Sequence, residues 1–209
     1  MNDALDVRAA LLTAATRRFA QGGYAGTSLQ VVADDVGVRK ASLLYWFPSK
    51  ADLREAVIDA QLDRWKDTLP AALAAATTGR DRFARILQVA LEFFDEDPDR
   101  ARLLLRECLD RPDAMRARLL TRVAPWMGLV TEAIRQGQRE GRVRPDLDPE
   151  AWLVQVVVLV LGSAALGDVA DRTVLHHSAA QHQDAADRRL RELVRVARSS
   201  LYLDDAPEG

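Results

Sequence analysis

Residues 27–50 constrain the fold more than any other part of the chain, because they predict two short helices joined by a sharp turn. The residues that repeat at the spacing of one apolar helical face are Leu29, Val32, Ala33 and Val36. Gly37 follows directly and has the backbone freedom that a sharp turn needs. We therefore expect a first helix that ends at Gly37, with Val38 filling the angle before a second helix.

The residues after this turn predict a second short helix with a narrow buried side. Leu43 and Phe47 lie four residues apart and would pack on the rest of the segment. The other faces carry Arg39, Lys40, Ser42, Tyr45 and Trp46. Such groups can reach phosphates and base edges, and a short helix with this surface is typical of a helix-turn-helix that enters the DNA major groove.

Capping residues indicate where the helices begin. Thr27 with Gln30 has the spacing of a capping box for the first helix, and Ser49 with Asp52 forms a second box that opens the next helix. A glycine pair at 22–23 stops an upstream helix. The first fifty residues are therefore expected to form three helices and the start of a fourth.

This region resembles the DNA-binding domain of the TetR family of transcriptional regulators. The matching residues are Gly23-Tyr24-Ala25-Gly26-Thr27-Ser28, Val32-Ala33, Val36-Gly37-Val38, Ser42-Leu43 and Phe47-Pro48-Ser49-Lys50. Residues 97–104 and 141–149 look like joints between helices of that family's ligand domain. The resemblance implies a helix-turn-helix DNA-binding head at residues 1–50 and a helical ligand-binding and dimerisation body at residues 51–209.

Two positions depart from the family pattern. Members usually have Tyr at position 44, where its hydroxyl commonly touches a phosphate, and this chain has Leu44. That contact is lost, or Tyr45 or Trp46 replaces it, or Leu44 meets a thymine methyl. Position 41 is often Gly, and Ala41 is a better helix former.

The expected DNA contacts divide into base readers and phosphate contacts. Arg39, Lys40 and Ser42 are the expected base readers, because Lys can donate to guanine and Ser can donate or accept. The expected phosphate contacts are Thr27, Tyr45, Trp46 and Lys50, two of which lie at helix N-termini. The alternative is a solvated polar face, with Tyr45 or Trp46 partly in the core.

Charge and composition agree with a DNA-binding head on a neutral body. The 209 residues carry a net charge of −2, which argues against a protein that coats nucleic acid generally. Residues 1–50 hold six Lys/Arg and four Asp/Glu, a net charge of +2. Cys108 is the single cysteine, so no intrachain disulfide can form, and no signal peptide is visible. We expect a protein of the bacterial cytoplasm, with no membrane partner.

The body is predicted to be helical throughout, which makes the fold all-α with about nine helices. We expect a helix from residue 50 that Pro70 kinks or ends, and further helices at 83–94, 103–109, 114–140, 150–169 and 184–202. The long helix 114–140 is interrupted at Pro125, and residues 167–183 are expected to form a loop. The apolar run at 151–166 is short for a bilayer span and predicts a deeply buried helix.

The last two helices predict a homodimer. Helix 150–169 is apolar on nearly every face and needs cover on all sides, whereas helix 184–202 is amphipathic. The resemblance implies that these helices form a four-helix bundle with a second copy. The expected interface residues are Val156, Leu159, Val160, Leu190, Leu193, Val194, Ala197 and Leu201. A two-fold dimer would place two DNA-reading helices about one helical turn apart on a near-palindrome.

Large apolar residues of the body could line a cavity for a hydrophobic or amphipathic small molecule, or could be ordinary core. The resemblance implies that some of them face a ligand. The candidates are Trp65, Phe83, Leu87, Phe94, Leu104, Trp126, Met127, Val130, Trp152 and, as a polar contact, Gln155.

Other features favour simple explanations. His176, His177 and His182 could sense a metal, but they lack a recognisable ligand set and are better explained as surface residues. Cys108 could sense oxidants but is more often a small apolar residue in such surroundings. The basic residues at 188–198 favour a solvated helix face over a second nucleic-acid patch. We find no enzyme motif and expect no cofactor and no metal.

These observations predict a ligand-responsive, DNA-binding transcriptional regulator. We expect a repressor that binds a palindromic operator as a homodimer and is released by a small molecule. The alternative is a helical ligand-binding or protein-interaction module that has lost specific operator binding, for which Leu44 is the only support. A helical enzyme is disfavoured by the missing motifs.

Overall fold

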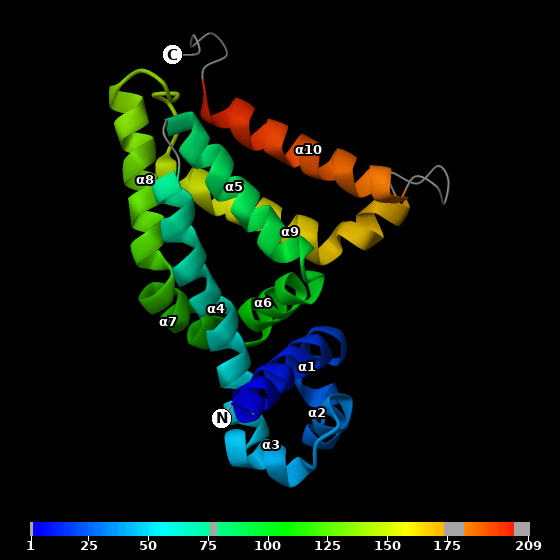
Figure 1. The fold of residues 1–209 in the computed structure, drawn as a ribbon. Coiled ribbons are helices and arrows are strands. Elements are labelled where there is room, and N and C mark those ends of the chain that lie inside the picture. Colours follow the sequence, from blue (N-terminus) through cyan, green and yellow to red (C-terminus); the bar gives the residue numbers. More distant parts are fainter. Residues whose placement is uncertain (1, 76–78, 174–181, 203–209) are drawn as a thin grey trace.

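The computed structural model describes residues 2–75, 79–173 and 182–202, and these residues form ten α-helices (Figure 1). The helices are α1 Asn2–Gly26, α2 Leu29–Val36, α3 Lys40–Trp46, α4 Lys50–Ala75, α5 Gly79–Asp95, α6 Pro98–Asp110, α7 Pro112–Arg122, α8 Ala124–Arg139, α9 Pro149–Thr173 and α10 His182–Leu201. Within these ranges the only β contact is an isolated antiparallel bridge between Val143 and Tyr202. The all-α prediction is confirmed, with ten helices in place of about nine.

Helices α1–α3 form a small head at one end of the molecule, and α4 leads from it into the body (Figure 1). The fully buried side chains at its centre include Leu11 of α1, Val32 of α2 and Leu43 of α3. Gly37 adopts a left-handed conformation with φ 74°, which ends α2 as expected. The three helices are therefore held by the apolar stripes that the sequence indicates.

The two expected capping boxes have different outcomes. Ser49 and Asp52 are confirmed: the Asp52 N–H donates to Ser49 Oγ at 3.1 Å, and Ser49 Oγ donates to the Asp52 carboxylate at 2.7 Å. The capping residue predicted for the start of α2 is wrong by one position. Ser28 is the N-cap, and its Oγ accepts the N–H of Val31 at 3.2 Å. Thr27 and Ser28 are both good capping residues, so local preference does not choose between them.

Three predicted boundaries in the body also differ from the structure. Helix α4 continues through Pro70 to Ala75 and packs along α5, so the N–H that the proline lacks does not end the helix. The segment 114–140 is two helices that meet at Val123, and Pro125 lies in the first turn of α8, where no N–H donor is needed. The predicted loop at 167–183 begins later, since α9 extends to Thr173.

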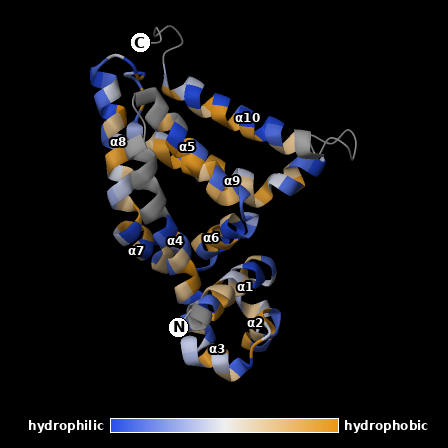
Figure 2. Ribbon diagram, viewed as in Figure 1, coloured by the Kyte–Doolittle hydropathy of each residue, from blue (hydrophilic) through white to orange (hydrophobic). Residues whose placement is uncertain are grey.

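Helix α9 packs against α5, α6, α8 and α10, yet one of its faces remains uncovered in the single chain. Its exposed large apolar residues are Val154, Val158, Leu159, Leu166 and Val169. The expectation of a deeply buried helix is therefore wrong for one subunit. Figure 2 shows α9 as a largely hydrophobic ribbon beside the mixed surface of α10. By length and composition alone this helix could also span a membrane, with mean hydropathy 2.1.

A polar clamp joins α9 to α10. The Arg189 guanidinium donates to the Asp171 carboxylate at 2.9 Å and to the Ser163 carbonyl at 2.9 Å. Gly167 lies between these two residues, one helical turn from each, and a Cβ there would collide with the guanidinium. The absence of a side chain at Gly167 thus lets Arg189 reach across the helix and set the position of α10.

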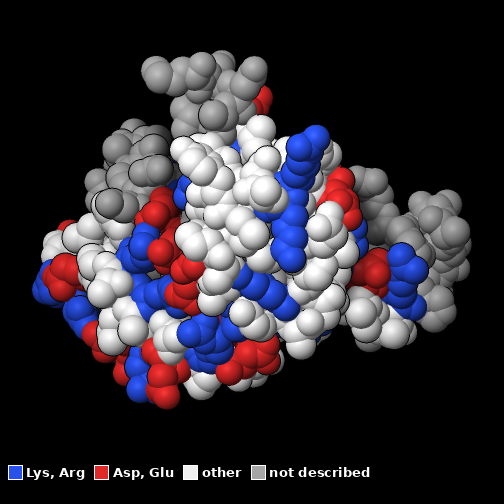
Figure 3. All heavy atoms as spheres, turned by 90° about the horizontal axis from the view of Figure 1, so that it is seen from below, with Lys and Arg blue, Asp and Glu red and all other residues white. Residues whose placement is uncertain are grey.

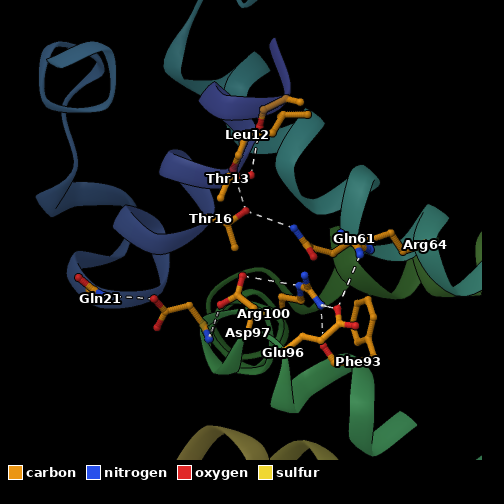
Figure 4. Close-up of polar contacts among 12 residues, drawn as sticks. Leu12, Thr13, Thr16, Gln21, Gln61, Arg64, Phe93, Glu96, Asp97 and Arg100 are labelled. Carbon is orange, nitrogen blue, oxygen red and sulfur yellow. Dashed lines mark hydrogen bonds and ion pairs between the residues drawn. The ribbon is translucent and has the colours of Figure 1, made fainter. Parts of the chain in front are cut away.

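The joint between head and body combines buried apolar residues of α1, α4 and α6 with polar contacts of α6 and α4 to α1. Gln21 of α1 donates to Asp99 of α6 at 3.1 Å, and Arg106 donates to the Ala20 carbonyl at 3.0 Å. Figure 4 shows Thr16 of α1 facing Gln61 of α4, whose amide donates to the threonine hydroxyl at 3.2 Å.

One acceptor in this joint is unsatisfied. The Gln61 Oε1 atom is buried and has no hydrogen-bond partner within the part of the chain that the structure describes.

Candidate nucleic-acid interface and ligand cavity

Helix α3 is anchored by two buried side chains and presents the rest of its surface outward. Leu43 is fully buried and Phe47 is 3% exposed, which fixes the helix against α1 and α2. The exposed residues at its start and along its outer face are Arg39, Lys40, Ala41, Ser42, Leu44 and Tyr45. Helix α3 itself lies at the free end of the molecule, away from the body (Figure 1). The predicted base readers Arg39, Lys40 and Ser42 are therefore all accessible.

The two aromatic residues of α3 differ in environment. Tyr45 is 79% exposed, whereas Trp46 is half-buried and packs against the core. Their rings meet edge to face with centroids 5.2 Å apart. Trp46 thus supports the position of the Tyr45 ring while keeping part of its own surface open.

The side chain of Thr27 is turned into the head and does not present its hydroxyl to a phosphate as expected. It is 5% exposed, and its hydroxyl lies 2.9 Å from the Gly23 carbonyl and 3.0 Å from the Arg18 carbonyl, to which it can donate. Its N–H is also used, since it donates to the Tyr24 carbonyl. The residue connects α1 to the start of α2, and the prediction is corrected because both donors are turned inward.

Lys50 begins α4 and contacts an aromatic ring of the head. Its Nζ lies 4.3 Å from the centroid of Tyr24, and Arg54 lies 4.6 Å from the same centroid. These cation–π contacts link the start of α4 to the end of α1. A phosphate contact from half-buried Lys50 stays a prediction.

Part of the basic charge of the head is paired internally. Arg18 donates to Asp35 at 2.6 Å and Arg17 at 3.2 Å, and the Arg18 hydrogen bond lowers the pKa of Asp35 to about 2. Arg39 and Lys40 have no ion-pair partner within the described residues. Figure 3 views this end of the molecule and shows separated basic side chains among uncharged and acidic atoms. Among the described residues, positive charge without an ion-pair partner therefore lies at the start of α3, while Arg8 and Lys50 lie over the rings of Phe47 and Tyr24.

A cavity of about 260 Å³ lies in the body between α5, α6, α9 and α10. Its apolar wall includes Leu91, Phe94, Val160, Ala164 and Leu190. Its polar wall includes Asp95, Arg102, Asp168, Asp171, Arg172 and Arg189. Most of these charges are paired with one another or with neighbours, so the cavity joins an apolar surface to an organised polar rim.

Residues 11–57 match the family model described as bacterial regulatory proteins, tetR family, and residues 103–183 match the tetracyclin repressor-like C-terminal domain. The chain belongs to the TetR family. The HTH-type transcriptional regulator RutR of Escherichia coli is 37% identical over 106 residues, which cover 48% of this chain and 47% of RutR. The HTH-type transcriptional activator FasR of Mycolicibacterium smegmatis is 31% identical over 97 residues, 46% of this chain and 44% of FasR. The chain thus spans less than half the length of these curated relatives.

Solved TetR-family folds match nearly the whole chain. The ketosteroid transcriptional regulator KstR2 of Mycobacterium tuberculosis superposes with a TM-score of 0.71 at 17% identity, covering 94% of this chain and 95% of that one. At this identity the likeness concerns the fold alone. It agrees with the arrangement of a three-helix head on a larger helical body.

Most of the residues expected to contact a ligand lie outside the cavity between α5, α6, α9 and α10. Of the candidates whose side chains the structure describes, Phe94 alone lines the cavity. Phe83 and Trp152 instead pack together with their ring centroids 5.2 Å apart and their planes tilted by 53°, in an aromatic cluster with Tyr202. The other candidates are dispersed: Leu87, Leu104 and Val130 are buried, Trp126 and Met127 are half-buried, Gln155 is exposed, and the side chain of Trp65 lies outside the described residues.

The expected dimer residues also divide between two surfaces. Leu159 is 43% exposed, but the residues that lie in the core of the single subunit are Val156, Val160, Leu193, Ala197 and Leu201. Leu190 and Val194 are half-buried, and Leu190 lines the cavity. The correction has a simple reason. An all-apolar helix gives no indication of which face packs within its own chain, and the amphipathic side of α10 is used on α9 of the same subunit.

The remaining candidates have varied outcomes. His176 and His177 lie outside the described residues, as does the side chain of His182. Cys108 is half-buried, and burial raises the pKa of its thiol, which disfavours the reactive thiolate. On α10, Arg188 and Arg191 are exposed, whereas Arg189 is turned into the clamp. That inward arginine was not expected, and no local signal in the sequence identifies it.

Proposed function

We propose that this protein is a transcriptional repressor that binds a palindromic operator as a homodimer and is released by a small molecule. The observation that carries the proposal is the exposed face of α3, held at the free end of the head by Leu43 and Phe47. Arg39 and Lys40 give this face unpaired positive charge, and Ser42 adds a donor and acceptor. Family membership and the geometry of the head both support major-groove binding.

Dimerisation is supported by the uncovered apolar face of α9. Val154 and Val158 are 59% and 58% exposed, and Leu166 continues the same face two turns later. On α10, Val196 is also exposed, at 40%. A contiguous apolar surface of this kind marks an association site, and a second copy would cover it symmetrically. Val158→Arg should therefore shift the protein to monomer in light-scattering chromatography, whereas Leu120→Arg on α7 should not.

The cavity supports an effector site near the joint with the head. Arg102 lines it and donates to Asp99 at 3.1 Å, and Asp99 in turn accepts a hydrogen bond from Gln21 of α1. A ligand that moves α6 would therefore disturb the contacts that position α1. An effector must favour the released state by about 3 kcal/mol to weaken operator binding about 100-fold. The expected effector has an apolar part and a polar or charged group.

The test of the proposed function is selection of binding sites from a random duplex pool at two salt concentrations. A palindromic consensus that survives the higher salt supports a dimeric operator-binding protein. Lys40→Ala and Ser42→Ala should each weaken binding to this consensus by about 1–3 kcal/mol without altering stability, because both side chains are exposed. Weak binding without a consensus would instead favour a helical module that has lost its operator.

Whether the protein represses or activates is tested in cells. A reporter placed behind the selected operator should be expressed less when the protein is present in the bacterial cytoplasm. An increase in expression with the protein would overturn the repressor assignment and leave operator binding intact.

A further inference from the structure

The outward face of α3 is apolar at its centre. Ala41 is exposed, Leu44 is 36% exposed and Tyr45 is 79% exposed. These residues are three and four apart in a helix, so Ala41 adjoins both others on the surface. Leu43 and Phe47 occupy the opposite side of the helix and hold this strip away from the head. The apolar strip, defined as Ala41, Leu44 and the ring of Tyr45, thus lies where the helix would meet DNA.

Leucine and alanine side chains cannot exchange hydrogen bonds with base edges. The major groove displays hydrogen-bond donors and acceptors on every base pair but only one apolar group, the C5 methyl of thymine. A leucine placed over any other pyrimidine edge would displace water without replacing its hydrogen bonds. The strip is therefore chemically complementary to a methylated pyrimidine edge.

We propose that Leu44, together with Ala41, reads the C5 methyl of a thymine in each operator half-site. The proposal rests on the proposed function and adds the base class that the head selects. With leucine at position 44, the phosphate contact could be lost, Tyr45 or Trp46 could replace it, or Leu44 could contact a thymine methyl. The proposal selects the last of these. Lys40 and Ser42 are exposed on either side of the strip, so the neighbouring base pairs can be read by hydrogen bonds.

The test begins with the operator obtained by site selection. Each thymine is replaced in turn by uracil, which keeps the pairing and hydrogen-bonding groups and lacks only the methyl. Burying one methyl group changes affinity about fourfold. At one thymine position per half-site we expect about a fourfold loss, and about a fifteenfold loss when both half-sites are changed.

Protein variants assign the effect to a residue. Leu44→Ala should lose most of the difference between thymine and uracil operators at that position, because the larger of the two side chains that contact the methyl is truncated. Leu109→Ala is the matched control, since Leu109 is a 73% exposed leucine on α6 far from α3. This control should keep the full difference between thymine and uracil.

A third arm separates the methyl from the base that carries it. At the same position, 5-methylcytosine should bind about fourfold more tightly than cytosine, since both form the same base pair. A specific operator with no sensitivity to uracil at any position would overturn the inference and leave the proposed function standing. A sensitivity that is undiminished in Leu44→Ala would overturn the role of Leu44. Absence of any specific site would overturn the proposed function and this inference together.

Discussion

The buried ion pair between α4 and α6 gives the sharpest test of how the head is held on the body. Arg54 Nε lies 2.6 Å from Glu107 Oε1, and the two side chains are only 10% and 7% exposed. Arg54 also lies over the ring of Tyr24 in the head. The pair thus joins α4, α6 and the end of α1.

We expect Glu107→Gln to lower the free energy of unfolding by about 3 kcal/mol. Removing one partner of a buried pair costs about 3–5 kcal/mol, because the other charge remains desolvated. The lower end of that range applies, since the Tyr24 ring and the new amide oxygen still face the guanidinium. Replacing both partners, Arg54→Leu with Glu107→Leu, should cost less than the single change, because no buried charge is left.

The measurement is urea unfolding followed by far-ultraviolet circular dichroism at one fixed protein concentration, which keeps any dimer contribution constant. Glu192→Gln is the control, since Glu192 and its partner Arg195 are both well exposed and water screens their attraction, so the change should leave the free energy of unfolding nearly unchanged. A loss below about 1 kcal/mol in Glu107→Gln would refute the reasoning. A double variant less stable than the single one would do the same.

Two further predictions concern the clamp and the head. Gly167→Ala should destabilise the protein by about 1–3 kcal/mol relative to Gly128→Ala in the same urea assay, because the new methyl group displaces the Arg189 guanidinium from its hydrogen bonds to Asp171 and Ser163. A methyl group at Gly128 on α8 meets open space, so Gly128→Ala should be neutral or stabilising. Hydrogen bonding from Arg18 lowers the pKa of Asp35 to about 2 in the folded protein, whereas the unfolded pKa is about 4. The stability that Asp35 contributes is therefore complete above the unfolded pKa and is lost as the pH falls through the folded pKa. The difference in unfolding free energy between the wild type and Asp35→Asn should therefore shrink between pH 5 and pH 2, and a difference independent of pH would contradict the assignment.

The head could be predicted closely because its determinants are local. Gly37 ends α2 where the apolar repeat stops, and Leu43 with Phe47 anchors α3 as their spacing indicates. The exposure of Arg39 and Lys40 follows from the same periodicity. A short helix with a narrow apolar stripe can be oriented in only one way, so its sequence also determines which side chains face outward.

The failures occur where several choices are locally equal. Thr27 and Ser28 can both cap a helix, and only packing against α1 turns the Thr27 hydroxyl inward. Pro70 can end a helix or sit within one, and the neighbouring helices decide between these outcomes. Sequence preference in such cases allows more than one structure.

The sequence by itself determined the all-α fold, the helix-turn-helix and the presence of an apolar α9. Only the tertiary structure decided which face of α9 is buried, where the cavity lies and why Arg189 points inward. A helix that is apolar all round has no preferred side until its neighbours are in place. The site at Gly167 depends on a missing side chain in one helix and a long one in another, and no periodicity within either helix records that pairing.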